Sequence, residues 1–155
     1  MPIEPFRLIK GGQFVCTPAW SNRAGNVDDF HRLYFPISGH AQLWADDQEV
    51  KIRPGSVYLI PGRRRISHVC RSAMQVNWLH FRACDLVDQA LLDRMDAVHI
   101  WPAHDWDYWI DTYQQLDQLF AEHPLKLVTA TEAMLMDQVG QLLVEYRLSS
   151  IRMIP

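Results

Sequence analysis

The chain has 155 residues, the size of a single domain, and a domain near this length buries roughly 68–70% of its unfolded surface. A formal net charge of −3 excludes the strongly basic surface of a typical nucleic-acid-binding domain, so we expect no DNA contact from this polypeptide itself. Three cysteines without CxxC spacing, and no apolar leader or run of about 18 apolar residues, indicate a cytoplasmic protein with reduced thiols and no membrane span.

The first 29 residues mix Pro, Gly, Asn and Asp with isolated aromatic residues. This composition predicts an irregular N-terminal arm over residues 1–29, with one short strand near Gln13–Cys16. The regular part of the domain is then expected to begin at residue 30.

Short segments with a period of two occupy residues 30–83. In the first of them Arg32 and Tyr34 project to one face, and Leu33 and Phe35 to the other, so we expect both faces to be covered. Further strands are predicted at 40–45, 49–53, 56–60 and 74–81, separated by turn signals at Gly39, Asp46-Asp47, Pro54-Gly55 and Pro61-Gly62. Many short strands at this spacing predict a β-sandwich or a barrel.

The pattern changes after residue 83. Residues 85–96 are expected to form a loop or a short helix, and Ala97–Trp101 one more strand. Helical periodicity then predicts an amphipathic helix over residues 105–122 and a second helix over about 124–147, after His123-Pro124.

The second predicted helix carries more apolar surface than one face needs. Its apolar residues recur every seven positions, in two rows made up of Val128, Leu135 and Leu142, and of Val139 and Tyr146. Such a seam fits a symmetric homodimer interface. Burial of the same residues within one chain accounts for the pattern equally well, and both interpretations stay open.

Three segments together resemble the N-terminal cupin domain of AraC-family transcriptional regulators. They read HRLYFPISG at residues 31–39, RPG followed by VYLIP at 53–61, and NWLHFR at 77–82. The resemblance covers about residues 30–150. It implies a mainly β fold, with a double-stranded β-helix (a cupin or jelly-roll barrel) over 30–103 and two antiparallel helices over 104–150 that form the dimer.

In that family the cupin domain binds a small effector, often a sugar, and a separate C-terminal domain with two helix-turn-helix motifs binds DNA. No helix-turn-helix pattern precedes Pro155. We therefore expect a sensor domain that contacts DNA only through a domain beyond this sequence. The segment GRRRISH at 62–68 departs from the Pro-Gly-x-x-His of the family, which leaves the equivalence of His68 open.

Catalytic cupins hold a metal with a His-x-His pair, a nearby Glu and a distant His. Here His31 is followed two positions later by Leu33, and His40 by Gln42, so neither histidine has a paired ligand on its strand face. His68 and His80 would be two ligands without a third. We predict no metal, no cofactor and no catalytic residue.

The predicted ligand-binding residues are polar and aromatic, namely Arg32, Tyr34, His68, Trp78 and His80. Arg32 and Tyr34 offer hydrogen bonds to hydroxyl groups, and Trp78 offers an aromatic face for the apolar side of a sugar ring. By the period of two, Met74, Val76 and His80 share the strand face of Trp78. The resemblance, rather than the periodicity, assigns this face to the barrel lumen. The plain alternatives are that Arg32 pairs with an acidic neighbour and that Trp78 fills a barrel without a cavity.

The sequence thus predicts a ligand-sensing, sugar-binding and dimerising domain of a transcription regulator, without catalysis. Two other classes of protein stay open. One is a small cupin enzyme, such as a sugar isomerase or a dioxygenase, and the other is a stand-alone sugar-binding module.

Overall fold

The computed structural model describes residues 6–84, 86–95 and 98–102, and scattered positions between 107 and 118. The strands are β1 (Phe6–Cys16), β2 (Asn22–Val27), β3 (His31–Gly39), β4 (Ala41–Ala45), β5 (Gln48–Ile52), β6 (Ser56–Ile60), β7 (Arg65–Val69), β8 (Met74–Ala83) and β9 (His99–Pro102). A 3-10 helix, η1 (Pro18–Trp20), lies between β1 and β2, and α1 (Leu86–Arg94) lies between β8 and β9. The described chain is therefore mainly β.

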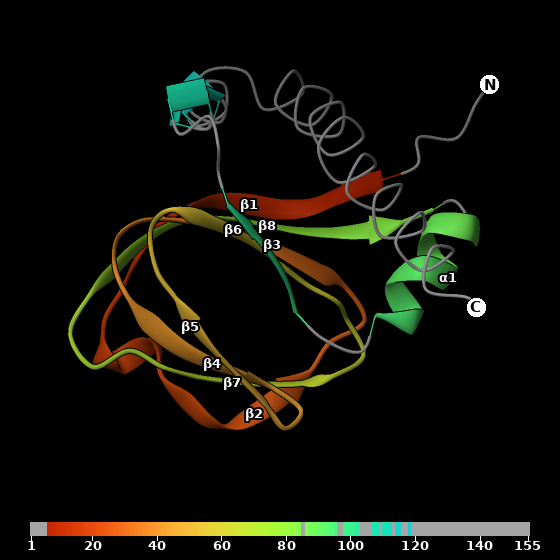
Figure 1. The fold of residues 1–155 in the computed structure, drawn as a ribbon, viewed down its shortest axis with the longest axis horizontal. Coiled ribbons are helices and arrows are strands. Elements are labelled where there is room, and N and C mark those ends of the chain that lie inside the picture. The colour runs from red at the N-terminus through yellow and green to blue at the C-terminus, as the bar shows by residue number, and fades with distance from the viewer. Residues whose placement is uncertain are drawn as a thin grey trace, which may run out of the picture.

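Two antiparallel sheets face each other and enclose the interior of the domain (Figure 1). The five-stranded sheet has the order β1-β8-β3-β6-β9, and the four-stranded sheet has the order β2-β7-β4-β5. Because β8 and β3 are central strands, their side chains contact neighbours on both sides. The strand pairs His31↔Phe81, Arg32↔His80 and Tyr34↔Trp78 set the register between them.

The alternation predicted for β3 is confirmed. Leu33 and Phe35 are completely buried on one face of the strand, and Tyr34 and Arg32 are buried on the other. Strands covered on both faces form where a sheet has neighbours above and below it. Here β3 separates two distinct apolar clusters.

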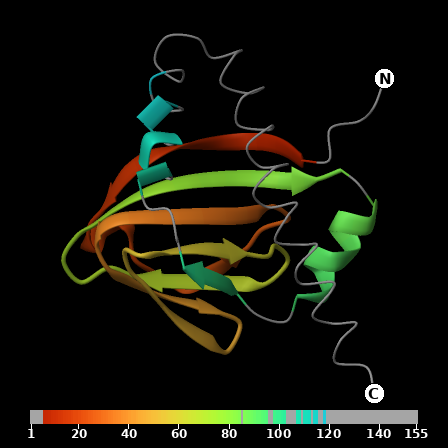
Figure 2. The ribbon, with the colours of Figure 1, turned by 45° about the horizontal axis from the view of Figure 1, so that its top comes forward.

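The outer cluster lies on the face of the five-stranded sheet that points away from the other sheet, and it includes Leu92 of α1 and Met95. The helix α1 lies beside the end of β8 (Figure 2). The remaining buried members of the outer cluster are Phe6, Leu33, Phe35, Val57, Leu59, Leu79 and Phe81. The inner cluster joins the two sheets and includes Leu43, Val50, Ile52, Ile60, Ile66 and Met74. Two apolar clusters on opposite faces of one sheet hold that sheet in place from both sides.

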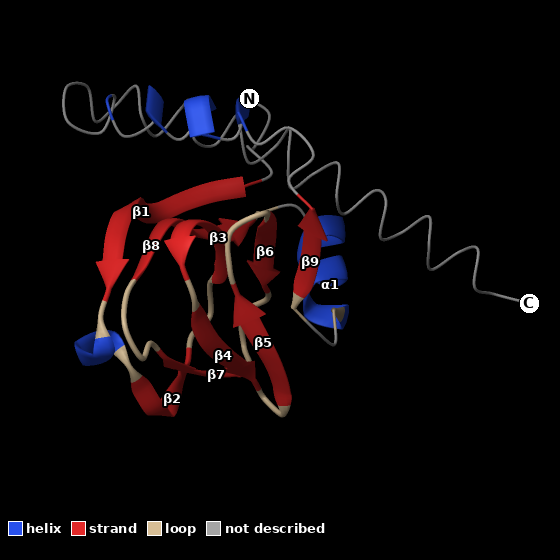
Figure 3. Ribbon diagram, turned by 60° about the vertical axis from the view of Figure 1, so that its left-hand side comes forward, coloured by secondary structure: helices blue, strands red, loops and turns tan. Residues whose placement is uncertain are grey.

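The segment predicted as an irregular arm is instead part of both sheets over its described residues, which corrects the expectation for 1–29. β1 pairs with β8 along its whole length, from Phe6↔Ala83 to Cys16↔Met74, and β2 pairs with β7 (Figure 3). β1 contains a bulge between Leu8 and Lys10, and a bulge disrupts the period of two that identifies a strand.

The strands and turns expected between residues 40 and 81 are confirmed within one to two residues at their ends. β7 was not predicted, whereas the short helix α1 and the strand β9 were expected. The described positions of the predicted helix 105–122, such as Asp107 and Ile110, are helical. The predicted helix 124–147, with its interface residues Val128, Leu135, Val139, Leu142 and Tyr146, lies outside the described residues.

Within the described residues, every helix is too short or too polar to span a membrane.

Candidate functional site

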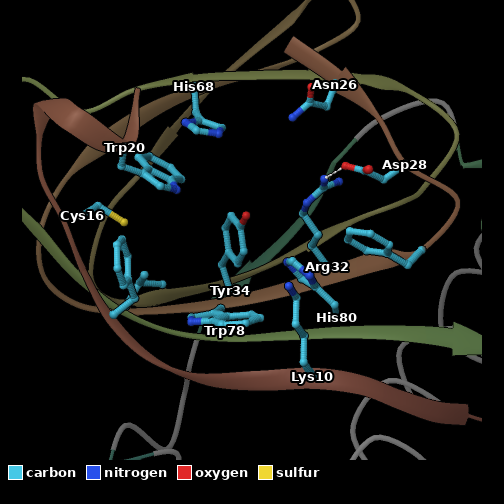
Figure 4. A pocket seen from close by; sticks show the side chains of 13 residues that line it. Lys10, Cys16, Trp20, Asn26, Asp28, Arg32, Tyr34, His68, Trp78 and His80 are labelled. Carbon is cyan, nitrogen blue, oxygen red and sulfur yellow. Dashed lines mark hydrogen bonds and ion pairs between the residues drawn. The ribbon is translucent and has the colours of Figure 1, made fainter. Parts of the chain in front are cut away.

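A pocket of about 360 Å³ lies between the two sheets, beside the inner cluster (Figure 4). Small-molecule sites typically have volumes from about 300 to 1,000 Å³, so this cavity is large enough for one small molecule. Side chains from β1, β3 and β8 line it on one side, and side chains from η1, β2 and β7 on the other. The lining residues are Lys10, Phe14, Cys16, Trp20, Asn26, Asp28, Phe30, Arg32, Tyr34, His68, Val76, Trp78 and His80.

The structure brings all five residues predicted to bind ligand to this one pocket: Arg32, Tyr34, His68, Trp78 and His80. Four of them form two cross-strand pairs, Arg32 with His80 and Tyr34 with Trp78, and thus make a continuous surface on β3 and β8. His68 comes from β7 and faces them across the cavity (Figure 4). Their binding role stays a prediction.

Arg32 is 7% exposed and carries the only buried positive charge among the described residues. Its Nη2 donates to the Asp28 carboxylate, and its guanidinium lies 4.8 Å from the centre of the Phe30 ring. Its Nη1 is buried without a hydrogen-bond partner among the described residues. Thus the acidic neighbour considered as an alternative partner is present, yet it uses one side of the guanidinium only. A buried donor without an acceptor costs about 1–3 kcal/mol, and more when it is charged.

His68 and His80 stand in aromatic surroundings. Trp20 stacks on His68 with ring centroids 3.7 Å apart, and Phe30 stacks on His80 at 4.4 Å. Burial, and secondly the nearby Arg32 charge, lower the pKa of each histidine to about 4. Both rings are therefore neutral at pH 7. The Nδ1 atom of each is buried without a partner within the described part of the chain.

Tyr34 and Cys16 are also uncharged at neutral pH. Burial raises the pKa of the Tyr34 phenol to about 12, and the Arg32 charge only partly opposes this shift. Burial, and secondly Cys70, raise the pKa of the Cys16 thiol to about 12. A thiol with this pKa carries almost no thiolate, so Cys16 is not an activated nucleophile.

His31 lies on the opposite face of β3 from the pocket and is packed there. Its Nδ1 accepts a hydrogen bond from the Gly62 backbone N–H at 2.9 Å. Its Nε2 lies 3.4 Å from Gln89 Oε1 of α1. His31 therefore joins the turn after β6 to α1 and does not contact a ligand in the pocket.

Eight lining residues were not predicted from the sequence: Lys10, Phe14, Cys16, Trp20, Asn26, Asp28, Phe30 and Val76. Val76 was placed on the correct face of β8, but only as a neighbour of Trp78. Most of the others lie in the segment predicted as an arm. The sequence did contain one signal for the β1 residues: Lys10, Phe14 and Cys16 are separated by even numbers of positions, as residues on one face of a strand are. In the structure they pair with His80, Val76 and Met74 of β8.

In the ranges that the structure describes, no three His, Cys, Asp or Glu side chains lie close enough together to hold a metal ion. The lining of the pocket includes two histidines, Asp28 and Cys16.

No family model matches this chain, and no curated protein matches it. Solved structures similar to it include ToxT from Vibrio cholerae O395 bound to (E)-4-(8-methylnaphthalen-1-yl)but-3-enoic acid, with a TM-score of 0.47, 12% identity, and coverage of 88% of this chain and 57% of ToxT. They also include a putative glyoxylate induced protein from Pseudomonas aeruginosa, with a TM-score of 0.42, 14% identity, and coverage of 60% of this chain and 35% of that one.

A third is a Cupin 2 conserved barrel domain protein from Salinispora arenicola CNS-205, with a TM-score of 0.39, 18% identity, and coverage of 60% of this chain and 77% of that one. This chain spans little more than half of ToxT. At such TM-scores and identities, none of these likenesses establishes a function.

Proposed function

We propose that this chain is the effector-binding domain of an AraC-type transcription regulator, with a cupin barrel that binds a small organic molecule and catalyses no reaction. The observation that carries the binding proposal is that three side chains, each with a buried and unpartnered polar atom, line the same cavity. Arg32 Nη1, His68 Nδ1 and His80 Nδ1 have no partner among the described residues, and their side chains all line the pocket. Buried polar groups normally have hydrogen-bond partners, and a bound ligand supplies them.

The walls of the pocket support a ring-shaped ligand, and a sugar is the class that the sequence predicts. Trp78 and Tyr34 present aromatic surface beside the unpartnered donors and acceptors (Figure 4). A sugar ring has one apolar C–H face and a rim of hydroxyl groups, which match an aromatic wall and a polar end respectively.

Replacing Trp78 by alanine tests the pocket. We expect a ligand found by a thermal-shift screen of monosaccharides, disaccharides and their acids to bind Trp78→Ala roughly 10- to 100-fold more weakly in calorimetry, since an aromatic wall contributes about 1.5–3 kcal/mol. Trp44→Ala is the matched control, because Trp44 lies on β4 and does not line the pocket. Equal affinity of Trp78→Ala and the parent protein would contradict this site.

The proposal includes a homodimer formed by the second predicted helix, and the apolar heptad pattern supports this part. A charge in the middle of a coiled-coil seam is strongly unfavourable. We therefore expect Leu135→Glu or Leu142→Glu to convert the dimer into monomers in analytical ultracentrifugation. Exchange of the neighbouring Gln141 for Glu, outside both rows, is the control. A dimer that persists in both leucine variants would move the interface elsewhere.

DNA binding belongs, in this proposal, to a separate helix-turn-helix domain of the regulator. The absence of catalysis is part of the proposal and has its own test. Elemental analysis of the purified protein is expected to find no bound transition metal, whereas one metal ion per chain would favour the cupin-enzyme alternative.

A further inference from the structure

The charges that line the pocket are distributed unevenly. Lys10, Asp28 and Arg32 gather at one end, whereas Trp20 and Cys16 lie at the other (Figure 4). Ligands with one polar end and one ring end fit a cavity of this kind. The chemistry of the polar end therefore determines which molecules are accepted.

The polar end has an excess of positive charge. Among the described lining residues, Lys10 and Arg32 are cations and Asp28 is the single carboxylate. His68 and His80 add no charge at pH 7, because burial holds the pKa of each near 4. A cavity with one more cation than anions attracts an anionic ligand, and a low dielectric constant around the cation and the ligand strengthens the attraction.

Arg32 adds a directional preference to this excess charge. Asp28 occupies its Nη2, while the buried Nη1 has no acceptor in the described part of the chain. Phe30 covers the flat face of the guanidinium, so the group is held in one orientation. A guanidinium forms its strongest hydrogen bonds with carboxylate oxygens, which are roughly twice as strong as bonds between neutral groups.

We propose that the ligand of this pocket is a ring compound with a carboxylate group, bound with the carboxylate against Arg32 Nη1 and Lys10 and with the ring beside Trp78. This inference rests on the proposed effector-binding function and specifies its ligand class. Two sources share this chemistry, namely a uronic acid and an aromatic carboxylic acid. The unpartnered Nδ1 atoms of His68 and His80 would bind the hydroxyl groups of the first.

Calorimetry with two matched pairs of compounds tests the charge directly. The pairs are D-galacturonate with D-galactose, and benzoate with benzyl alcohol. We expect the acid of at least one pair to bind roughly 10- to 100-fold more tightly than its neutral partner, the range for a hydrogen bond to a charged group. The pair that shows the difference identifies the source.

Two charge-removing variants assign the effect to the pocket. Arg32→Gln is expected to abolish the preference for the acid, and Lys10→Gln, at an exposed position that does not compromise folding, to reduce it several-fold. Lys51→Gln removes the same charge from an exposed position on β5 outside the pocket and is expected to leave both affinities unchanged.

Three results would overturn the inference. Neutral compounds that bind as tightly as their acids in both pairs would show that the carboxylate is not recognised, while the effector-binding function would stand. A preference for the acid that Lys10→Gln and Lys51→Gln weaken equally would be a general charge effect. If neither acid binds at millimolar concentration the ligand class is wrong, and the sensor function is then decided by the separate screen with Trp78→Ala.

Discussion

Replacing Gly39 by alanine is expected to lower the free energy of unfolding by about 2–5 kcal/mol, the sum of a left-handed backbone and an overpacked contact. Gly39 ends β3 with a φ of +73°, a conformation that side chains disfavour. A Cβ atom at this position would lie 2.0 Å from the Ala73 carbonyl oxygen. That oxygen belongs to the backbone beside β8, so the clash is relieved only by a shift of a central strand.

Gly55→Ala is the matched control for this variant. Gly55 also has a positive φ, of +101°, but no atom lies within 4 Å of the Cβ position. We expect it to lose only the backbone contribution, about 1–2 kcal/mol. Urea denaturation monitored by tryptophan fluorescence measures both losses, and equal losses would show that the contact with Ala73 is not the cause.

Lowering the pH from 7 to about 4.5 is expected to reduce the free energy of unfolding by about 2–4 kcal/mol through His68 and His80 together. In the unfolded chain each histidine binds a proton as the pH falls below its ordinary pKa of 6.5. In the folded protein burial and Arg32 lower each pKa to about 4, so both rings stay neutral. The unfolded state thus binds more protons between pH 6.5 and 4, and stability falls with the pH.

Each histidine contributes about 1–2 kcal/mol to this loss in the free energy of unfolding. This is roughly half of the full linkage value, because neither side chain is completely buried. A His68→Gln/His80→Gln double variant is expected to show a much flatter dependence. His31, whose pKa burial also lowers, and Asp29, whose pKa the hydrogen bond from Arg82 lowers, both contribute to the remaining slope. Denaturation curves at pH 7, 6, 5 and 4.5 measure the slope, and an identical slope in parent and double variant would exclude these two residues as its source.

The strands between residues 40 and 81 could be predicted because local chemistry determines them. Asp46 adopts a φ of +49° in the predicted Asp-Asp turn. Before the turn, buried Leu43 alternates with half-buried Gln42 and Trp44, and after it, buried Val50 alternates with exposed Glu49 and Lys51. Turn residues and a period of two act within four or five positions of the chain, so they are visible in the sequence.

β2 and β7 could not be predicted in the same way, because their formation depends on distant partners. β2 reads NRAGNV, and its single larger apolar residue, Val27, is 57% exposed. Its strand conformation comes from hydrogen bonds to β7, and β7 in turn pairs with β4. Tertiary pairing overrides the weak intrinsic preference of such segments.

In the candidate site, too, the residues that could be predicted are those with a local sequence signal. The sequence placed Trp78 and His80 on one face of β8 by periodicity, and the resemblance placed Arg32 in the lumen. Neither signal identified Asp28 or Lys10, which determine the charge of the pocket. They reach it from the β2–β3 turn and from β1, and only the fold brings those two segments together.

The apolar clusters and the pocket are formed by largely different residues, which has a consequence for protein engineering. No residue of the outer cluster lines the pocket, and the inner cluster shares only a few members with it, such as Tyr34 and Val76. Stability and selectivity are thus encoded by largely separate sets of side chains. Libraries that randomise Lys10, Asn26, His68 and His80 would therefore retain a folded barrel and provide a scaffold for biosensors with new specificities.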